Sequence, residues 1–270
     1  MVRLNKGQRA SIVYHRLFGY GLSAIELEKW EMAPQPAAQV SNIEYRISNI
    51  DKNQRQKISE KKLRLAKKAA GLLGKIPTVR MVAVTGALAM KNATSESDID
   101  LMIITRADSL WLTRALTYFV LRITGFEIRV PRDKNQKDKL CLNIWLDETA
   151  LVWPKSDRNL YTSHEIAQIV PLVNKNQTYE RFLVANDWIQ NFWPFAVKPQ
   201  DTKILKYKDT RERNLISNIG YRISSVVENL AFQLQYAHMK SKITREVITP
   251  HKALFHPIDW AEKIYGILQS

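Results

Sequence analysis

Apolar residues in the first 75 positions recur at helical spacing. Ser23, followed three residues later by Glu26, forms the pattern of a capping box, which predicts a helix start within residues 12–30. Over residues 57–73 the apolar positions follow one side of a predicted helix, while lysine and arginine occupy the other side. We therefore expect residues 1–75 to form a helical segment with a basic face that lies in solvent.

The pattern changes after Gly74 and Pro77, which are typical of a helix end. Helical spacing returns at residues 109–124. Short apolar and β-branched runs predict four strands, at residues 80–85, 98–105, 126–130 and 140–146. The order strand, strand, helix, strand, strand predicts a compact mixed unit over residues 76–155.

After Trp153 the periodicity is almost wholly helical and is interrupted by prolines. We expect a C-terminal helical domain over residues 156–270. The predicted fold class is α/β of the α+β kind, with a small mixed sheet in the core, N-terminal helices before it and a helical region after it.

The charge balance favours an anionic partner. The chain carries 41 Lys and Arg against 26 Asp and Glu, a formal charge of +15, which suits nucleotides, RNA or DNA; a solvated basic surface is the alternative. Cys141 is the only cysteine, so an internal disulfide is excluded and a reducing cytoplasm is expected. We find neither a signal-peptide pattern nor an apolar stretch long enough to span a bilayer, and expect no membrane role.

Two carboxylates begin the predicted strand at residues 98–105. Side chains alternate along a strand, so Asp98 and Asp100 project from one face while Ile99 and Leu101 enter the core. Two neighbouring carboxylates need a cation, and Mg²⁺ or Mn²⁺ takes oxygen ligands that substrate phosphates complete. The pair therefore predicts a metal site, although a solvated acidic strand end would have the same sequence.

A glycine precedes the carboxylates at the end of the first predicted strand. Gly86 has no Cβ, so phosphate oxygens can approach the backbone amides at that point. We predict a nucleotide-binding set of Thr85, Gly86, Ala87 and Ser97, together with Arg106, which we expect to lie near the carboxylates and to reach a phosphate. His164, near a predicted helix start, is expected to have a capping or surface role.

Several motifs resemble those of the DNA polymerase β-type nucleotidyltransferase superfamily, in which a strand ending in Gly-Ser is followed by Asp-x-Asp on the next strand. More narrowly, the chain resembles a group of uncharacterised prokaryotic nucleotidyltransferase-domain proteins, from about residue 76 to its C-terminus. The matching segments are VTGALAM, SESDIDLMIITRADSLWLTR, KLCLNIWLDE, NLYTSHEIAQIVPL, FLVANDWIQNFWP and ALFHPID. The earlier segment YHRLFGYGLSAIELEKW resembles the start of a winged helix, which is shortened in this chain.

The resemblance implies transfer of a nucleoside monophosphate from a nucleoside triphosphate to an unknown acceptor, such as an RNA or DNA end or a protein. Asp98 and Asp100 would hold the metal, and the third carboxylate of the superfamily corresponds to Asn143. Glu127 and Asp147 are the other candidates for that third position. An amide oxygen can coordinate a metal but carries no charge. Asn143 at the third position, and Ala87 where the superfamily has serine, lead to a rival hypothesis. In that hypothesis the protein is catalytically silent and binds nucleotides or nucleic acid.

Overall fold

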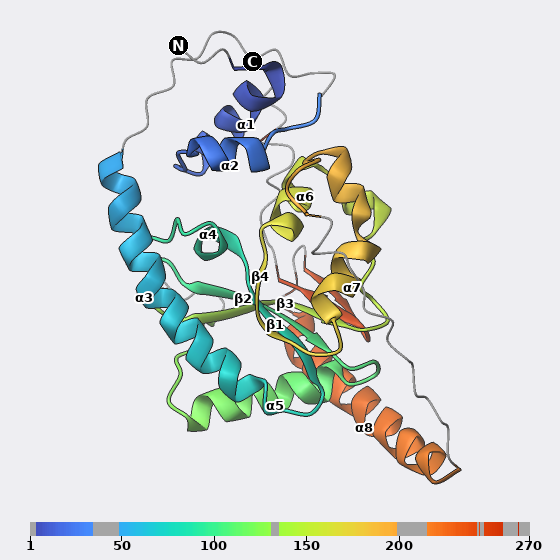
Figure 1. Ribbon diagram of the computed structural model, residues 1–270. Helices are drawn as coiled ribbons and strands as arrows, with labels where there is room; N and C mark the ends of the chain where they lie inside the picture. The colour runs from blue at the N-terminus through green and yellow to red at the C-terminus, as the bar shows by residue number, and fades with distance from the viewer. Residues whose placement is uncertain are drawn as a thin grey trace.

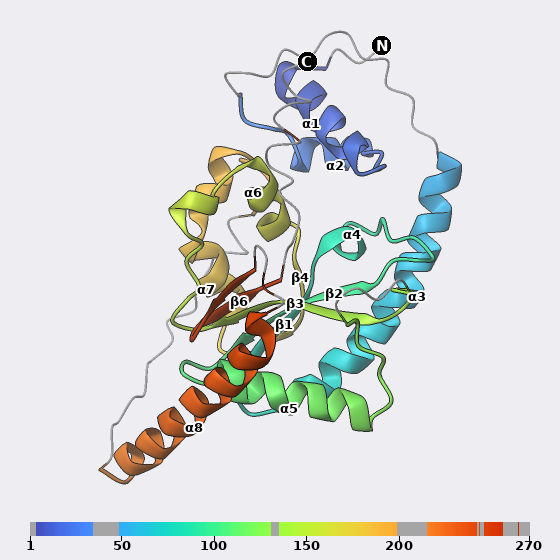
Figure 2. The same cartoon turned by 180° about the vertical axis from the view of Figure 1, so that it is seen from behind.

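A computed structural model describes residues 4–34, 49–130, 135–198, 215–241, 243, 246–255 and 264. Side chains are described from residue 52 in the second range and from residue 225 in the fourth. The chain forms a mixed sheet with helices on both of its faces (Figures 1 and 2). The α+β class expected from the sequence is confirmed.

The first helices are short and carry the predicted cap. Helix α1 spans Lys6–Leu17 and helix α2 spans Ala24–Lys29. Ser23 accepts a hydrogen bond from the amide of Glu26, and the Glu26 carboxylate accepts one in return from the amide of Ser23. The turn between the two helices contains Gly19 at a positive φ of 62°. Helix α3 then runs over Asn49–Leu73 and passes along one side of the sheet (Figure 1).

The sheet has the strand order β4-β1-β2-β3-β6-β5. Strands β2 and β3 are parallel, and every other neighbouring pair is antiparallel. The strands are β1 (Val79–Val84), β2 (Ile99–Thr105), β3 (Leu140–Asp147), β4 (Val170–Asn174), β5 (Val247–Thr249) and β6 (Lys252–Leu254). The remaining elements are α4 (Gly86–Ala89), α5 (Leu110–Ile123), η1 (Lys155–Asp157), α6 (Leu160–Ala167), α7 (Thr178–Ala185), η2 (Asp187–Asn191) and α8 (Leu215–Lys240).

Alternation along β2 divides the core between the two faces of the sheet. Leu101 and Ile103 pack with residues of α3 and α5 on one face. Met102 and Ile104 pack on the other face with residues of α1, α6 and α7. Asp100, two residues before Met102, therefore projects towards the α1 and α6 side.

Two expectations from the sequence are wrong. Residues 126–130 form no strand, and only Ile128 makes an isolated bridge, to Leu140. The region after Trp153 is not almost wholly helical, because β4, β5 and β6 all join the sheet. Apolar runs of three to five residues are too short for their periodicity to separate a strand from a helix, so pairing with β1 and β3 decides their structure.

His164 is buried, contrary to the capping or surface role that its sequence position favours. Its Nε2 lies 3.0 Å from Nε2 of His15, another buried residue, on α1. Nδ1 of His15 lies 2.8 Å from the carbonyl oxygen of Ser11, which can only accept, so His15 donates from Nδ1 and accepts at Nε2 from His164. This pair ties α1 to α6.

Among the described helices, none combines the length and the apolar character needed to cross a membrane.

Candidate metal and nucleotide site

The topology of the sheet brings three segments together at one edge. Strand β1 is antiparallel to β2, so the end of β1 lies beside the start of β2, and the amide of Thr85 donates to the carbonyl oxygen of Asp100 over 3.1 Å. Strand β3 is parallel to β2, so its start lies at the same edge. The carboxylates, the glycine turn and the first residues of β3 therefore meet, as the sequence predicts for Asp98, Asp100 and Gly86.

Asp98 and Asp100 form a compact ligand group with Cys141. One potential ligand atom from each of the three residues lies within 4.8 Å of the others. Burial, and next the charge of Asp98, raise the pKa of Asp100 to about 7, although a hydrogen bond from Cys141 and the charge of Arg129 oppose the rise. Burial and the two carboxylates also raise the pKa of the Cys141 thiol, so the sulfur keeps its proton. The group is thus a pair of carboxylates with a neutral thiol beside them.

Asn143 lies beside the carboxylates, at an irregularity in β3. Leu101 pairs with Leu142 and Met102 pairs with Ile144, so Asn143 is the extra residue of a bulge. Its Nδ2 donates to Oδ1 of Asp100 over 2.7 Å. Its Oδ1 is buried, and within the described part of the chain no group donates a hydrogen bond to it. The predicted third position therefore lies in the site, with an acceptor atom that has no partner.

Gly86 is required at its position for two reasons. Its φ of +59° is in the left-handed region, which side chains disfavour. A Cβ built on Gly86 would lie only 2.7 Å from Oδ2 of Asp100, so any other residue would collide with the carboxylate. Its neighbour Thr85 is buried, and Ala87 is exposed. The backbone at Gly86 can thus approach the carboxylates and whatever they bind.

The loop that carries the carboxylates is fixed by a buried lysine. The Nζ of Lys62, on α3, donates to the carbonyl oxygens of Ser95 and Ser97 over 3.2 and 2.8 Å, and it pairs with Asp138 over 2.6 Å. The hydroxyl of Ser97 donates to the carbonyl oxygen of Thr94, so it helps to form the turn. Only 1% of the Lys62 side chain is exposed, which corrects the expectation of a wholly solvent-facing basic side of α3.

Arg129, which the sequence did not indicate, is the cation that pairs with the carboxylates among the described residues. Its Nη1 lies 2.7 Å from Oδ2 of Asp98 and 3.8 Å from the sulfur of Cys141. Burial, the largest single cause, would lower the pKa of Arg129, but the charge of Asp98 and the interactions with Cys141 together outweigh burial and raise it. The sequence could not predict the ion pair between Arg129 and Asp98, because a single arginine in a strand-like segment has no characteristic pattern. The ion pair depends on how residues 126–130 pass beside β3.

Helix α6 contributes two further residues that the sequence did not indicate. Burial, and next the charge of Asp100, raise the pKa of Glu165 to about 8. Burial and the charges of Glu165 and Asp100 likewise raise the pKa of Tyr161. The described residues on this side of the sheet thus include the carboxylates of Asp98, Asp100 and Glu165, of which Asp98 is paired with Arg129, and a further positive charge would relieve their repulsion.

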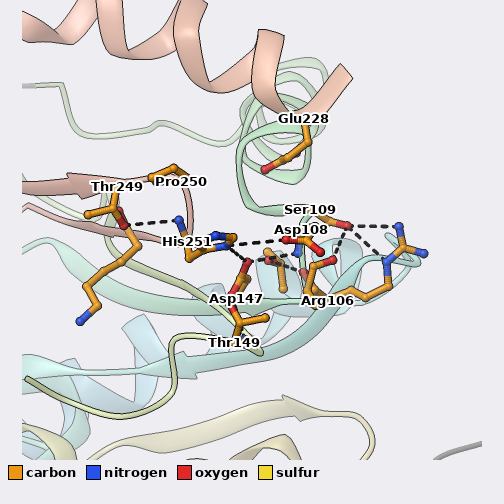
Figure 3. A network of polar contacts seen from close by, with 12 residues as sticks. Arg106, Asp108, Ser109, Asp147, Thr149, Glu228, Thr249, Pro250 and His251 are labelled. Carbon is orange, nitrogen blue, oxygen red and sulfur yellow. Dashed lines mark hydrogen bonds and ion pairs between the residues drawn. The ribbon is translucent and has the colours of Figure 1, made fainter. Parts of the chain in front are cut away.

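Arg106 does not lie in the site, so the prediction that it is close to the carboxylates is wrong. It follows the last residue of β2, a strand of seven residues that spans about 20 Å, and its guanidinium donates to the hydroxyl of Ser109 over 3.2 Å (Figure 3). Asp147, one alternative third carboxylate, also lies at that far end. It accepts hydrogen bonds from Thr149 and from the amide of Asp108, and its Oδ2 lies 2.8 Å from Nδ1 of His251 (Figure 3).

Glu127, the other alternative for the third position, is exposed and pairs with Lys139 over 3.9 Å. Asn143 is therefore the one of the three candidates that contacts the carboxylate pair.

The residues present fit a hard divalent cation. Asp98 and Asp100 offer carboxylate oxygens, and the buried Oδ1 of Asn143 is an acceptor that needs a partner. Oxygen donors of this kind suit Mg²⁺ or Mn²⁺, whereas the protonated thiol of Cys141 is a poor ligand for either. Because Gly86 has no Cβ, the carboxylate of Asp100 can lie close against the backbone of the turn.

No protein-family model matches the chain, and neither a curated protein nor a solved structure matches it. The likeness to nucleotidyltransferases therefore rests on the sequence motifs alone.

Proposed function

We propose that the protein is a metal-dependent nucleotidyltransferase, which moves a nucleoside monophosphate from a nucleoside triphosphate to an acceptor. The observation that carries the proposal is the meeting of Asp98, Asp100 and Asn143 beside the glycine turn at Gly86. Carboxylates with an unpartnered amide oxygen suit a cation, and a backbone without a Cβ suits the phosphates attached to it.

Asp98, Asp100 and the amide oxygen of Asn143 would hold Mg²⁺ or Mn²⁺. When bound, this cation supplies positive charge to the phosphates of the substrate. Gly86 would let the triphosphate lie against the backbone. The guanidinium of Arg129, 2.7 Å from Asp98, could turn from this carboxylate to a phosphate oxygen.

In the reaction, an acceptor oxygen forms a bond to the α-phosphorus, and the bond from that phosphorus to the bridging oxygen of the β-phosphate breaks. Pyrophosphate leaves, and the hydroxyl proton of the acceptor goes to a base. Asn143 cannot take that proton, because an amide is not a base. Glu165, a carboxylate on the same side of the sheet whose pKa is raised to about 8, is a candidate for that base.

The single cysteine suits a reducing compartment, and the proposal includes a cytoplasmic location. The net charge of +15 is consistent with an RNA or DNA end as the acceptor, and a protein acceptor is the alternative that labelling would reveal.

The first test of the proposal is metal-dependent nucleotide binding. Asp98→Asn combined with Asp100→Asn is expected to abolish binding of Mg·ATP in calorimetry, because both charged ligands are lost. Asp187→Asn combined with Glu60→Gln removes the same charge from exposed positions and serves as the matched control. If the Asp98 and Asp100 variant binds Mg·ATP as well as this control does, the site is misplaced.

The second test distinguishes an enzyme from a catalytically silent nucleotide-binding protein. The silent protein is the second candidate function, and the hydrogen bond from Asn143 to Asp100 and the ion pair between Arg129 and Asp98 favour it. Label from α-labelled ATP should move to an acceptor in a host lysate with the parent protein and not with the double variant. Binding of Mg·ATP without any such transfer would reject the enzymatic proposal and leave the binding one.

A further inference from the structure

Cys141 lies among the ligand atoms of the proposed metal site, although sulfur is a poor ligand for Mg²⁺ or Mn²⁺. Cys141 of β3 pairs with Asp100 of the parallel strand β2, so the two side chains project from the same face of the sheet. One potential ligand atom from each of Asp98, Asp100 and Cys141 lies within 4.8 Å of the others. The strand register thus places one sulfur ligand beside two oxygen ligands.

The amide oxygen of Asn143 is a second, independent indication that this group binds an ion. Asn143 is only 7% exposed, and its Nδ2 donates to Oδ1 of Asp100 over 2.7 Å, so the amide lies against the ligand group. Its buried Oδ1 receives no hydrogen bond from the described part of the chain. A buried acceptor without a partner is unfavourable, and a cation bound by the neighbouring carboxylates and thiol would satisfy it.

Two carboxylate oxygens, a sulfur and an amide oxygen suit a thiophilic divalent cation such as Zn²⁺. This ion is usually four-coordinate and tetrahedral, with sulfur at about 2.3 Å and oxygen at about 2.0–2.2 Å. Ligand atoms at those distances lie roughly 3.3–3.6 Å apart, a spacing that atoms within 4.8 Å of one another reach by small side-chain rotations. Thiolate ligands select Zn²⁺ over Mg²⁺, which prefers oxygen ligands.

The position of Arg129 suits this set of ligands. Two carboxylates and a thiolate carry three negative charges, and a divalent cation neutralises two of them. The guanidinium of Arg129 has its Nη1 2.7 Å from Oδ2 of Asp98 and 3.8 Å from the sulfur of Cys141, so its charge balances the one that remains. The same guanidinium therefore favours a thiolate at Cys141 when a metal is bound.

We propose that Asp98, Asp100, Cys141 and the amide oxygen of Asn143 form a closed site for Zn²⁺, which excludes Mg²⁺ and regulates the protein. As the bond between the metal and the sulfur forms, the thiol proton is released to solvent. The four ligands complete a tetrahedral shell and leave no position for a phosphate oxygen. Mg²⁺ is octahedral and keeps positions for water and phosphate oxygens, so it leaves room for a nucleotide. The protein with Zn²⁺ bound is therefore inactive.

The first test is the absorption spectrum of the full chain with Co²⁺, a spectroscopic substitute for Zn²⁺. Cys141 is the only cysteine, so a sulfur-to-cobalt charge-transfer band can come from no other residue. The parent should show this band, Zn²⁺ should abolish it, and Cys141→Ser should lack it. Asp98→Asn with Asp100→Asn should weaken Co²⁺ binding at least about 100-fold. The control Asp187→Asn with Glu60→Gln removes the same charge from exposed positions and should keep the band.

Competition with Mn²⁺ measures the exclusion without reliance on activity. Zn²⁺ should release Mn²⁺ from the parent, seen as a gain in the electron paramagnetic resonance signal of the free ion. Cys141→Ser should require at least about 100-fold more Zn²⁺ for the same release, because it lacks the sulfur ligand. If this variant fails to fold, the parent alone decides: Zn²⁺, and not Mg²⁺, should slow the reaction of Cys141 with a thiol reagent at least about tenfold.

The inactivity of the zinc-bound protein rests on the proposed function, whereas the ligation of Zn²⁺ by Cys141 does not. A parent without the cobalt–sulfur band overturns the inference, and so does a Cys141→Ser variant that exchanges Mn²⁺ for Zn²⁺ as readily as the parent. Label transfer from ATP that persists at saturating Zn²⁺ overturns the regulation. A cobalt–sulfur band in a parent that transfers no label with Mg²⁺ supports the zinc site and rejects the proposed activity instead.

Discussion

The ion pair between Arg129 and Asp98 leads to a prediction about metal affinity. A divalent cation at Asp98 must compete with the guanidinium, whose Nη1 lies 2.7 Å from Oδ2. A charge-assisted hydrogen bond contributes about 1.5–3 kcal/mol, and exposure of 37% of the arginine side chain reduces this to roughly 1–2 kcal/mol. Arg129→Gln should therefore tighten binding of Mn²⁺ alone by roughly 5- to 30-fold.

Binding of Mn²⁺ can be followed by the electron paramagnetic resonance signal of the free ion at pH 8, where most of Asp100 is ionised because its pKa is about 7. Arg181→Gln is the matched control, because Arg181 also pairs with a carboxylate, that of Glu148, over 2.7 Å and is similarly exposed. For Mn·ATP, Arg129→Gln should increase the affinity by a smaller factor than for Mn²⁺ alone. The variant then also loses the attraction between the guanidinium and the triphosphate. If Arg129→Gln binds Mn²⁺ no more tightly than Arg181→Gln does, the guanidinium does not compete with the metal.

Two further predictions concern Asn143 and the buried histidines. Asn143→Asp with Ala87→Ser should lower the free energy of unfolding in EDTA by about 1–3 kcal/mol, because the hydrogen bond to Asp100 is replaced by repulsion between two carboxylates. The same variant should raise Mn²⁺-dependent label transfer at least tenfold. Slower transfer would show that the asparagine is a working part of a different site. Burial lowers the pKa of His15 to about 4, and burial and the charge of His15 lower the pKa of His164. As the pH falls, the unfolded chain binds protons at these histidines at a higher pH than the folded protein does. The free energy of unfolding therefore decreases as the pH falls from about 6.5 to 4. Denaturant titrations should show that the free energy of unfolding falls by about 2–3 kcal/mol over this pH range from His15 alone. An equal fall in the variant His15→Gln with His164→Gln would contradict this prediction.

The sequence predicted those features that depend on neighbouring residues. The capping box at Ser23 involves residues three apart, and the common face of Asp98 and Asp100 follows from alternation along a single strand. The requirement for glycine at position 86 follows in part from the same local geometry, because the turn that ends β1 has a positive φ. In each case the interacting groups are separated by a few bonds along the chain, so the pattern of residue types contains the information.

Long-range pairing decided the rest of the site. Asn143 meets Asp100 because β3 pairs with β2 in a parallel register that places Cys141 opposite Asp100 and Asn143, at a bulge, two residues later. Arg106 follows the same strand as the carboxylates, yet the length of β2 carries it to the opposite edge of the sheet. Its nearness along the sequence was therefore misleading, because a strand separates its ends by about 3.3 Å per residue.

The sequence by itself determined the α+β class, the strands β1, β2 and β3, and the pair of carboxylates with the glycine before it. The tertiary structure alone decided that Arg129 neutralises Asp98, that Lys62 is buried under the loop of Ser97, and that β4 completes one edge of the sheet. The physical reason is that periodicity reports which face of an element is apolar, whereas charge pairing and strand register depend on which distant segments pack together.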